Sequence, residues 1–418
     1  MRKILSLFAL LFYLTSHAQT DSTTLSKKEK LSNIFSKFDI SGYGVVNYYN
    51  FDWETLPDKR DAVDPERFNL YLKYHFNSFI ELKTEIEFEH GGVGAAMEFD
   101  PLEEFGEYDE SISKGGEVIL EQINLLFKIK SYFNIRMGKM RIYMGNAADL
   151  DRPINYFTAY RPEVENTILP LGWYETGLEL SGTIPLSKEK QFPAFQYKAY
   201  LVTGIDNSGF SSLNFIRKGY QKRFEMINAD NLAYILRLDL VFKEKSYFGF
   251  NYYAGNGTGN RPKKDYTLAS WLHLADLHFN YKSDHWRLSA YALLAHLQNS
   301  EALSAANRNL SNNLDVKRTP VAKMAAGAYI EGGYNLLHLA KKDMKHKLFL
   351  FGRAEWYDSM FRTAGQVTDN PRYSRQVYTL GFNYFPIKEI VIKTHYAYRL
   401  LGTKETEKTF SLGFGFSF

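Results

Sequence analysis

The chain has 418 residues, no cysteine and a formal net charge of +4 at pH 7, and aromatic residues make up 16% of it. The lack of cysteine excludes a disulfide framework, a thiolate metal site and a thiol-linked lipid anchor, and the nearly balanced charge gives no sign of nucleic-acid binding. The mean hydropathy is -0.35, and no stretch after the N-terminal segment approaches the roughly 20 apolar residues of a membrane-spanning helix.

The first predicted element is a secretory signal peptide at residues 1–18. A short basic region precedes an apolar run that is too short to form a stable membrane anchor. Ser16 and Ala18 supply the small residues expected before a cleavage site. We therefore expect residues 1–18 to be removed on export, and the polar residues 19–36 to form a short periplasmic lead-in. The alternative is a buried N-terminal helix.

Residues 37–418 are dominated by segments in which apolar and polar residues alternate. The last ten residues, for example, have large apolar groups at every even position and small or polar groups at every odd one. This period of two indicates a β-strand. In water such a strand is an aggregation-prone edge, whereas in a membrane barrel its apolar face meets lipid. Sixteen strands are predicted, at 37–50, 64–77, 79–90, 117–130, 132–140, 172–184, 194–204, 230–244, 245–255, 269–282, 284–297, 322–337, 346–359, 374–386, 388–401 and 407–418.

The links between these strands alternate between short and long. Asn77 and Ser78 mark one tight turn, and residues 385–387 (Phe-Pro-Ile) mark another. Both follow even-numbered strands, whereas the long links all follow odd-numbered strands. Bacterial outer-membrane barrels have an even number of strands, short periplasmic turns and longer outer loops. This parity predicts an all-β fold, a transmembrane antiparallel β-barrel over residues 37–418.

The polar parity of the strands supplies the residues expected to line the lumen. Acids concentrate in the third and sixth predicted strands and bases in the last four. This distribution predicts a transverse field that influences ion preference; alternatively, the charges pair across strands and keep the interior wet. The basic candidates are Arg67, Lys73, Arg136, Lys198, Arg237, Arg287, Arg353, Arg375, Lys393 and Arg399. The acidic candidates are Asp39, Glu81, Glu85, Glu87, Glu89, Glu175, Glu179, Asp239, Asp276, Glu331 and Glu355.

Segment 141–171, the third outer loop, is the strongest functional candidate. Its prolines stiffen it, and its aromatic residues give it groups with which to pack. We expect it to fold inward and narrow the pore, where arginine suits oxyanions because its planar fork donates two hydrogen bonds. Alternatively, its arginines pair with Asp149, Asp151, Glu163 or Glu165 to form a structural lid. The candidate constriction and anion-contact residues are Arg136, Lys139, Arg141, Arg152 and Arg161.

Loop 91–116 is dense in carboxylates, which suit a divalent cation or ions that bridge lipopolysaccharide. It lacks EF-hand spacing, and a solvated acidic loop is the simpler interpretation. The sequence contains no H-E-x-x-H, G-x-S-x-G or P-loop motif. We therefore predict no catalytic residue, no metal site and no cofactor.

Two segments resemble the phosphate-selective porin O/P family of Bacteroidetes-type outer membranes. Residues 135–139 (IRMGK) are similar to the family's R-x-G-K strand, and residues 169–177 (LPLGWYETG) are similar to its P-x-x-W-x-E-x-G motif at the start of the next strand. The resemblance implies a sixteen-stranded, generally trimeric porin that passes small anions through a pore narrowed by the third loop. The lumen predicted here differs from the family's basic pores because it is mixed in sign.

These observations predict a porin of a Gram-negative outer membrane that allows passive diffusion of small hydrophilic solutes, phosphate or other anions among them, and that is not an enzyme. Its expected partners are permeating ions, outer-membrane lipid, lipopolysaccharide and further copies of the chain in a homotrimer, with no nucleic acid. Two alternatives remain: a plugged barrel that acts as a binding or adhesion protein, and a barrel enzyme, which would need a Ser/His or Asp/His set near the lipid boundary.

Overall fold

The computed structural model describes residues 35–90, 118–148, 150–170, 172–187, 191–221, 227–262, 264–309, 318–340 and 345–418. The predicted signal peptide, nearly all of the predicted lead-in and the acidic loop 91–116 lie outside these residues. Residues 39–418 form one compact unit, which contains the strands discussed below.

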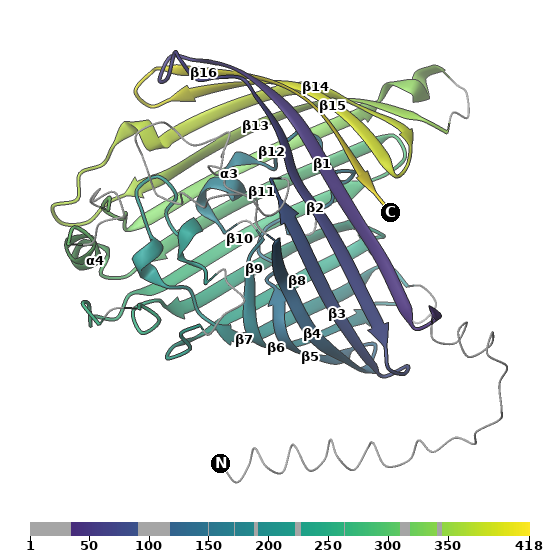
Figure 1. Ribbon diagram of the computed structural model, residues 1–418, viewed down its shortest axis with the longest axis horizontal. Coiled ribbons are helices and arrows are strands. Elements are labelled where there is room, and N and C mark those ends of the chain that lie inside the picture. The colour runs from purple at the N-terminus through teal and green to yellow at the C-terminus, as the bar shows by residue number, and fades with distance from the viewer. Residues whose placement is uncertain are drawn as a thin grey trace, which may run out of the picture. The chain divides into compact units, whose positions relative to one another are not determined.

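Sixteen antiparallel strands close into a single barrel whose order around the ring follows the chain (Figure 1). The last strand pairs with the first, with Tyr43 opposite Ser417 and Trp53 opposite Glu407. The predicted all-β barrel of sixteen strands is therefore confirmed, and the strand ends differ from the prediction by at most three residues. The strands are β1 (Phe38–Trp53), β2 (Ala62–His75), β3 (Ile80–Glu89), β4 (Val118–Lys130), β5 (Phe133–Arg141), β6 (Tyr174–Pro185), β7 (Ala194–Thr203), β8 (Leu232–Lys243), β9 (Ser246–Asn256), β10 (Trp271–Lys282), β11 (Trp286–Leu297), β12 (Met324–Asn335), β13 (Lys347–Arg362), β14 (Ser374–Ile387), β15 (Ile390–Leu401) and β16 (Thr406–Ser417).

One turn lies later than the sequence suggested. The turn expected at 385–387 is at 388–389, because β14 continues to its last residue, Ile387. The β14–β15 pairing shifts register between Tyr384 and Ile387. Pro386 lies within this irregularity, where its missing N–H group does not break a regular ladder. Placing Pro386 in the turn was wrong because a proline at a register shift does not end a strand.

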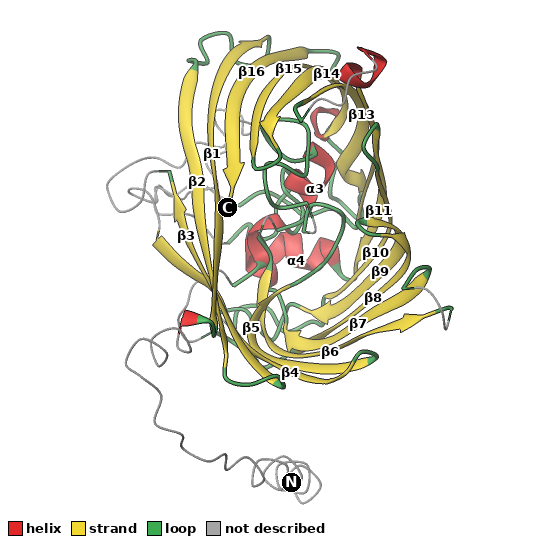
Figure 2. Ribbon diagram, turned by 90° about the vertical axis from the view of Figure 1, so that its right-hand side faces the viewer, coloured by secondary structure: helices red, strands yellow, loops and turns green. Residues whose placement is uncertain are grey.

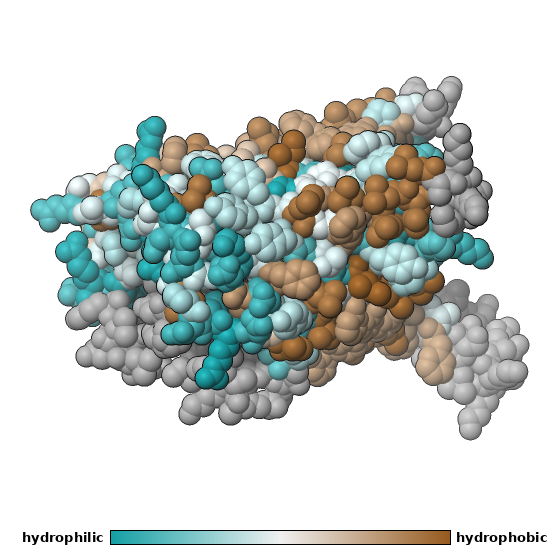
Figure 3. All heavy atoms as spheres, turned by 90° about the horizontal axis from the view of Figure 1, so that it is seen from above, coloured by the Kyte–Doolittle hydropathy of each residue, from teal (hydrophilic) through white to brown (hydrophobic). Residues whose placement is uncertain are grey.

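Alternate residues along the strands face two different environments. In β14, Leu380 and Phe382 are exposed on the outer face, whereas Thr379 and Asn383 beside them are buried. Figure 3 shows apolar side chains gathered over the right-hand part of the barrel wall and hydrophilic ones gathered at its left-hand end. An apolar outer face and a polar inner face are typical of membrane barrels. None of the helices in the described residues is long and apolar enough to cross a membrane.

The two ends of the barrel differ in their connections. One end, here called the turn end, carries mostly tight links such as 76–79, where the Asn77 side chain accepts hydrogen bonds from the Phe79 and Ile80 N–H groups, each at 2.8 Å. The other end, the loop end, carries the long links with α3 (Glu163–Ile168), α4 (Ser300–Asn307), η1 (Asn207–Gly209), η2 (Arg217–Gly219) and η4 (Pro371–Tyr373). The short helix η3 (Leu336–Ala340) lies in a longer link at the turn end.

An apolar core lies inside the lumen near the loop end. Phe210 and Phe215 of the β7–β8 link and Leu303 of α4 join inward-facing strand residues such as Leu272 and Leu293 in one buried cluster. Burial of these groups removes apolar surface from water, which stabilises the loops in place. This core was missed in the sequence, although segment 205–216 contains five large apolar residues that a solvated loop does not need.

Candidate functional site

The third loop, residues 142–173, lies in the barrel lumen and connects β5 to β6. Its hydrogen bonds reach strands on several sides: Tyr43 of β1 donates to Asp151 at 2.8 Å, and the Gly145 N–H donates to Asp276 of β10 at 3.0 Å. The helix α3 within this loop lies inside the ring of strands (Figure 2). The loop is therefore bound across the interior.

A buried polar network holds the start of the loop. Arg237 donates to the Gly145 carbonyl at 3.3 Å and pairs with Asp239 at 2.6 Å. The His278 ring lies between Asp239, at 2.7 Å, and Asp276, at 2.8 Å. Gly145 has φ +71°, and a side chain there would collide with the Glu165 carboxylate. The site therefore requires glycine at position 145.

The next residue, Asn146, fixes the loop to β10 and β11. Its side-chain amide donates to the Phe279 and Ala290 carbonyls at 3.2 and 2.9 Å and to the Ser289 hydroxyl at 3.1 Å. Side-chain bonds to strand carbonyls fix both the position and the direction of the loop, because each carbonyl belongs to the rigid barrel wall.

Asp151 is the centre of an arginine cluster. Arg141 lies 3.1 Å from its carboxylate, Arg161 donates to it, and Arg67 of β2 lies 3.7 Å away. Burial would raise the pKa of Asp151, but the guanidinium groups of Arg141, Arg161 and Arg67 outweigh it and hold this pKa below its ordinary value of 3.8. Arg141 and Arg161 thus make the carboxylate pairs that were the alternative to anion contact.

Arg152, the third arginine of the loop, makes different contacts. It donates to the Ser417 hydroxyl at 2.6 Å and to the Ser41 hydroxyl at 3.2 Å. Its guanidinium lies 5.4 Å from the centre of the Tyr71 ring. Neutral partners leave its charge less compensated than those of Arg141 and Arg161.

The tip of the loop docks on β13 and β15. Phe157 stacks on Phe351 with ring centres 4.7 Å apart and an interplanar angle of 4°. Lys393 of β15 donates to the Tyr156 and Thr158 carbonyls, each at 2.9 Å. An offset aromatic stack adds stability beyond the area that it buries, so apolar and charged contacts hold the tip together.

The helix α3 completes the attachment through two glutamates. Glu163 accepts two hydrogen bonds from the Arg399 guanidinium, both at 2.8 Å, and one from the Tyr357 hydroxyl at 2.8 Å. Glu165 accepts from the Ala147 N–H at 2.7 Å and from the Tyr329 hydroxyl at 3.1 Å. Burial, with a further contribution from Asp276, raises the pKa of Glu165 to about 8.

Most of the predicted lumen charges are paired. Arg353 lies 3.1 Å from Glu331 and 2.6 Å from Glu355. Arg399 also pairs with Glu407 of the neighbouring strand, and Arg375 donates to the Tyr357 hydroxyl at 3.5 Å. Glu85 accepts from Asn69, Gln122 and Arg141, and Glu87 is buried. Pairing across strands therefore accounts for much of the inner charge.

A second set of lumen bases is partly exposed. Lys73, Lys83, Arg136 and Lys198, on β2, β3, β5 and β7, all lie in the half of the lumen nearer the turn end. Arg136 lies 3.5 Å from Glu179, and the Lys198 ammonium lies 3.4 Å from the centre of the Tyr143 ring. These charges are available to solutes in a way that the buried pairs are not.

The strand segment Ile135–Lys139 holds two of the predicted residues, Arg136 and Lys139, and Lys139 lies over the same Tyr174 ring as Arg141. Lys139 is buried and donates to the Leu120 carbonyl at 3.4 Å. Gly138 has φ +119°, and a side chain there would lie 2.4 Å from the Ile123 carbonyl. In the described part of the chain, no group of three or more His, Cys, Asp or Glu residues is placed to hold a metal ion.

Comparison with known proteins places the fold. No family model matches the chain. A curated relative from Aquifex aeolicus (strain VF5), described as an uncharacterized protein, is 25% identical over 372 residues, which cover 88% of this chain and 77% of the relative. This identity is too low to assign a family, so membership of the phosphate-selective porin family stays a prediction.

Three solved structures illustrate the likeness. The loop L8 deletion mutant of OmpT, an outer membrane protein of Vibrio cholerae, has a TM-score of 0.52 at 12% identity, covering 91% of this chain and all of that one. The anion-selective porin from Comamonas acidovorans has a TM-score of 0.51 at 10% identity, with coverages of 91% and 100%. Salmonella typhi OmpF in complex with daunomycin has a TM-score of 0.51 at 12% identity, with coverages of 91% and 97%. The chain therefore has the closed barrel fold of outer-membrane porins.

Proposed function

We propose that the protein is an outer-membrane porin through which small hydrophilic solutes diffuse passively. The observation that carries this proposal is the closed barrel with an apolar outer face, a charged inner face and a third loop bound across the lumen. In outer-membrane barrels the apolar outer face contacts lipid, and the polar lumen holds water. Export by the signal peptide at 1–18, the lead-in at 19–36, contact with lipopolysaccharide and assembly as a homotrimer are parts of the same proposal.

The third loop is the proposed constriction. Its contacts with β10, β13 and β15 hold it inside the ring of strands, and its residues Ile142 and Val164 belong to the apolar core of the loop end. A pore is most selective where it is narrowest and where charged groups line it. The exposed bases Lys73, Arg136 and Lys198 support a preference for anions, with phosphate as one candidate solute.

A second candidate function is a plugged barrel that binds a partner at its outer loops. The observation that favours it is the burial of apolar residues from three loops inside the loop end of the lumen, among them Ile142, Phe210 and Leu303. Such packing narrows the path for water and ions. The two functions differ in one measurable property, the ion current through the barrel.

Planar-bilayer recording of the refolded mature protein tests both candidates. A salt gradient gives the ion preference, and phosphate added afterwards tests block. Stepwise current with anion preference and block by phosphate supports the porin and its anionic solute, whereas steps with cation preference support a general porin only. A silent wild-type barrel overturns the porin proposal if a variant with residues 146–169 replaced by a short Gly-Ser linker conducts in the same bilayer, since the loop is then a plug.

A further inference from the structure

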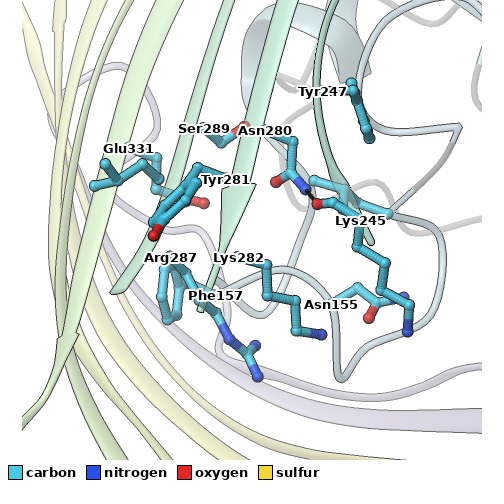
Figure 4. A pocket seen from close by; sticks show the side chains of 12 residues that line it. Asn155, Phe157, Lys245, Tyr247, Asn280, Tyr281, Lys282, Arg287, Ser289 and Glu331 are labelled. Carbon is cyan, nitrogen blue, oxygen red and sulfur yellow. Dashed lines mark hydrogen bonds between the residues drawn. The ribbon is translucent and has the colours of Figure 1, made fainter. Parts of the chain in front are cut away.

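A cavity lies inside the barrel beneath the third loop, near the turn end. Its volume is about 170 Å³, and it is partly open to solvent. Asn155 and Phe157 from the tip of the loop line one side, and Tyr247 of β9, Asn280 of β10 and Ser289 of β11 line the other (Figure 4). The cavity is large enough for a molecule with a six-membered ring.

Three bases converge on this cavity. Lys245 of the β8–β9 turn, Lys282 at the end of β10 and Arg287 near the start of β11 all line it, and Lys245 and Arg287 are electrostatic neighbours of Lys282. Within the described residues, neither lysine forms an ion pair. Glu331 is the acid in the lining, and it already accepts a hydrogen bond from Arg353 at 3.1 Å. Beyond the lining, Glu244 lies beside Lys245, and Lys347 adds another positive charge nearby. The lining therefore carries excess positive charge.

Arg287 is the most constrained of the three bases. One of its terminal nitrogens donates to the Ile154 carbonyl at 3.0 Å, and its guanidinium lies 4.7 Å from the ring centres of both Phe349 and Phe385. Its Nε is buried and has no hydrogen-bond partner among the described residues. Glu331 is an electrostatic neighbour of Arg287 but forms no ion pair with it among the described residues, so a bound anion would offset part of the cost of burying the guanidinium.

The rest of the lining is aromatic or neutral. Tyr247 offers a ring surface beside the buried Phe157, while Asn280 donates to the Lys245 carbonyl at 2.6 Å and so fixes the turn that carries that lysine. Pockets of this kind bind ligands whose apolar body packs on the rings and whose polar group is held by a few charges. A fully hydrated inorganic anion would not use the rings.

We propose that this cavity binds a small carboxylate with a compact apolar body, such as benzoate. The carboxylate lies between Lys282 and Arg287, and the ring of the ligand packs against Tyr247. This proposal rests on the proposed function in one respect: the ligand reaches the cavity as a solute that enters the barrel. Binding itself is measured without any current, so that a failure of transport and a failure of binding are distinguishable.

Isothermal titration calorimetry of benzoate into the refolded full-length barrel in detergent tests the site. We expect saturable binding to the wild type and a loss of roughly tenfold or more in affinity in Lys282→Gln, as for removal of a charge-assisted hydrogen bond. Lys388→Gln is the matched control, because Lys388 is an exposed turn lysine at the same end with 90% of its side chain accessible, and its affinity for benzoate should equal that of the wild type.

Two further probes separate the contribution of the ring from that of the charge. Benzamide has the ring without the charge, and inorganic phosphate has the charge without the ring, so both should bind more weakly than benzoate. Equal binding of benzoate and benzamide, or equal affinity in Lys282→Gln and the wild type, overturns the proposal. Phosphate that binds as well as benzoate overturns the assigned solute class. A barrel that binds benzoate but carries no current contradicts the porin function and leaves this site standing.

Discussion

The lumen has two walls that contain the same types of residue but differ in burial. On the anchored wall, β12–β16, the bases Arg353, Arg375, Lys393 and Arg399 are 4%, 1%, 2% and 3% exposed. On the accessible wall, β2–β7, the bases Lys73, Lys83, Arg136 and Lys198 are each partly exposed. The period of two places every one of them on the inner face, and three bases of the anchored wall, Arg353, Lys393 and Arg399, donate to the third loop.

This difference in burial shows that a charged side chain in the lumen has one of two roles: it holds the third loop, or it is accessible to ions. Arg399 and Lys393 give their donors to Glu163 and to loop carbonyls, so they hold the loop. Lys198 is partly exposed, and its ammonium lies over the Tyr143 ring. Removing one partner of a buried pair costs about 3–5 kcal/mol, whereas exposed pairs contribute about 0–1 kcal/mol. The walls should therefore respond differently to substitution.

The largest expected effect comes from removing the third loop, which crosses the lumen. Replacement of residues 146–169 by a short Gly-Ser linker should raise single-channel conductance severalfold, because the loop no longer crosses the lumen. Shortening the exposed β1–β2 link at 54–61 is the control and should leave conductance unchanged. Should the shortened barrel fail to fold, the charge-neutral double variant Glu163→Gln with Arg399→Gln loosens the same loop. Unchanged conductance in folded variants would mean that the loop is not the constriction.

The second prediction contrasts one arginine from each wall. Arg399→Met leaves Glu163 and Glu407 buried without their guanidinium and should lower the free energy of unfolding by about 3–5 kcal/mol. Arg136→Met should cost about 1 kcal/mol, since Arg136 is partly exposed and Lys198 remains near Glu179. Urea unfolding of the barrel in lipid vesicles, followed by tryptophan fluorescence, measures both. Equal losses would show that the two walls do not differ energetically.

The fold followed from the sequence because its rules are local. Alternation within each segment and the parity of the links were enough to place sixteen strands. The partners inside the lumen are not local: Arg399 and Glu163 are 236 residues apart, and no spacing in the chain indicates that they meet. The candidate arginines of the loop were identified by residue type, but their partners depend on the fold of the loop. Arg141 and Arg161 meet Asp151 within the loop, whereas Arg152 reaches the Ser417 hydroxyl of β16.

The third prediction concerns pH and the attachment of α3. The pKa of Glu165 is raised to about 8 from its ordinary value of 4.5, so the folded barrel binds a proton that the unfolded chain releases between these values. Binding of this proton by Glu165 therefore stabilises the folded barrel fully below pH 4.5. The contribution to the free energy of unfolding falls by at most about 1.4 kcal/mol per pH unit as the pH rises and is lost above pH 8. Glu165→Gln should flatten the pH dependence of unfolding over this window. An identical slope in the variant and the wild type would contradict the prediction.

The smallest expected effect tests the accessible wall alone. Lys73→Gln, Arg136→Gln and Lys198→Gln, combined in one variant, should move the reversal potential in a salt gradient toward cation preference. These bases are partly exposed in the turn-end half of the lumen, where they act on ions, and Lys198 also lies over the Tyr143 ring of the third loop. The single variant Arg152→Gln is the comparison, because that guanidinium donates to the hydroxyls of Ser417 and Ser41 within the loop attachment. The field that an ion feels is set by the charges nearest its path. A larger shift of the reversal potential in Arg152→Gln than in the triple variant would therefore show that the loop, and not the accessible wall, carries the charge that sets ion preference.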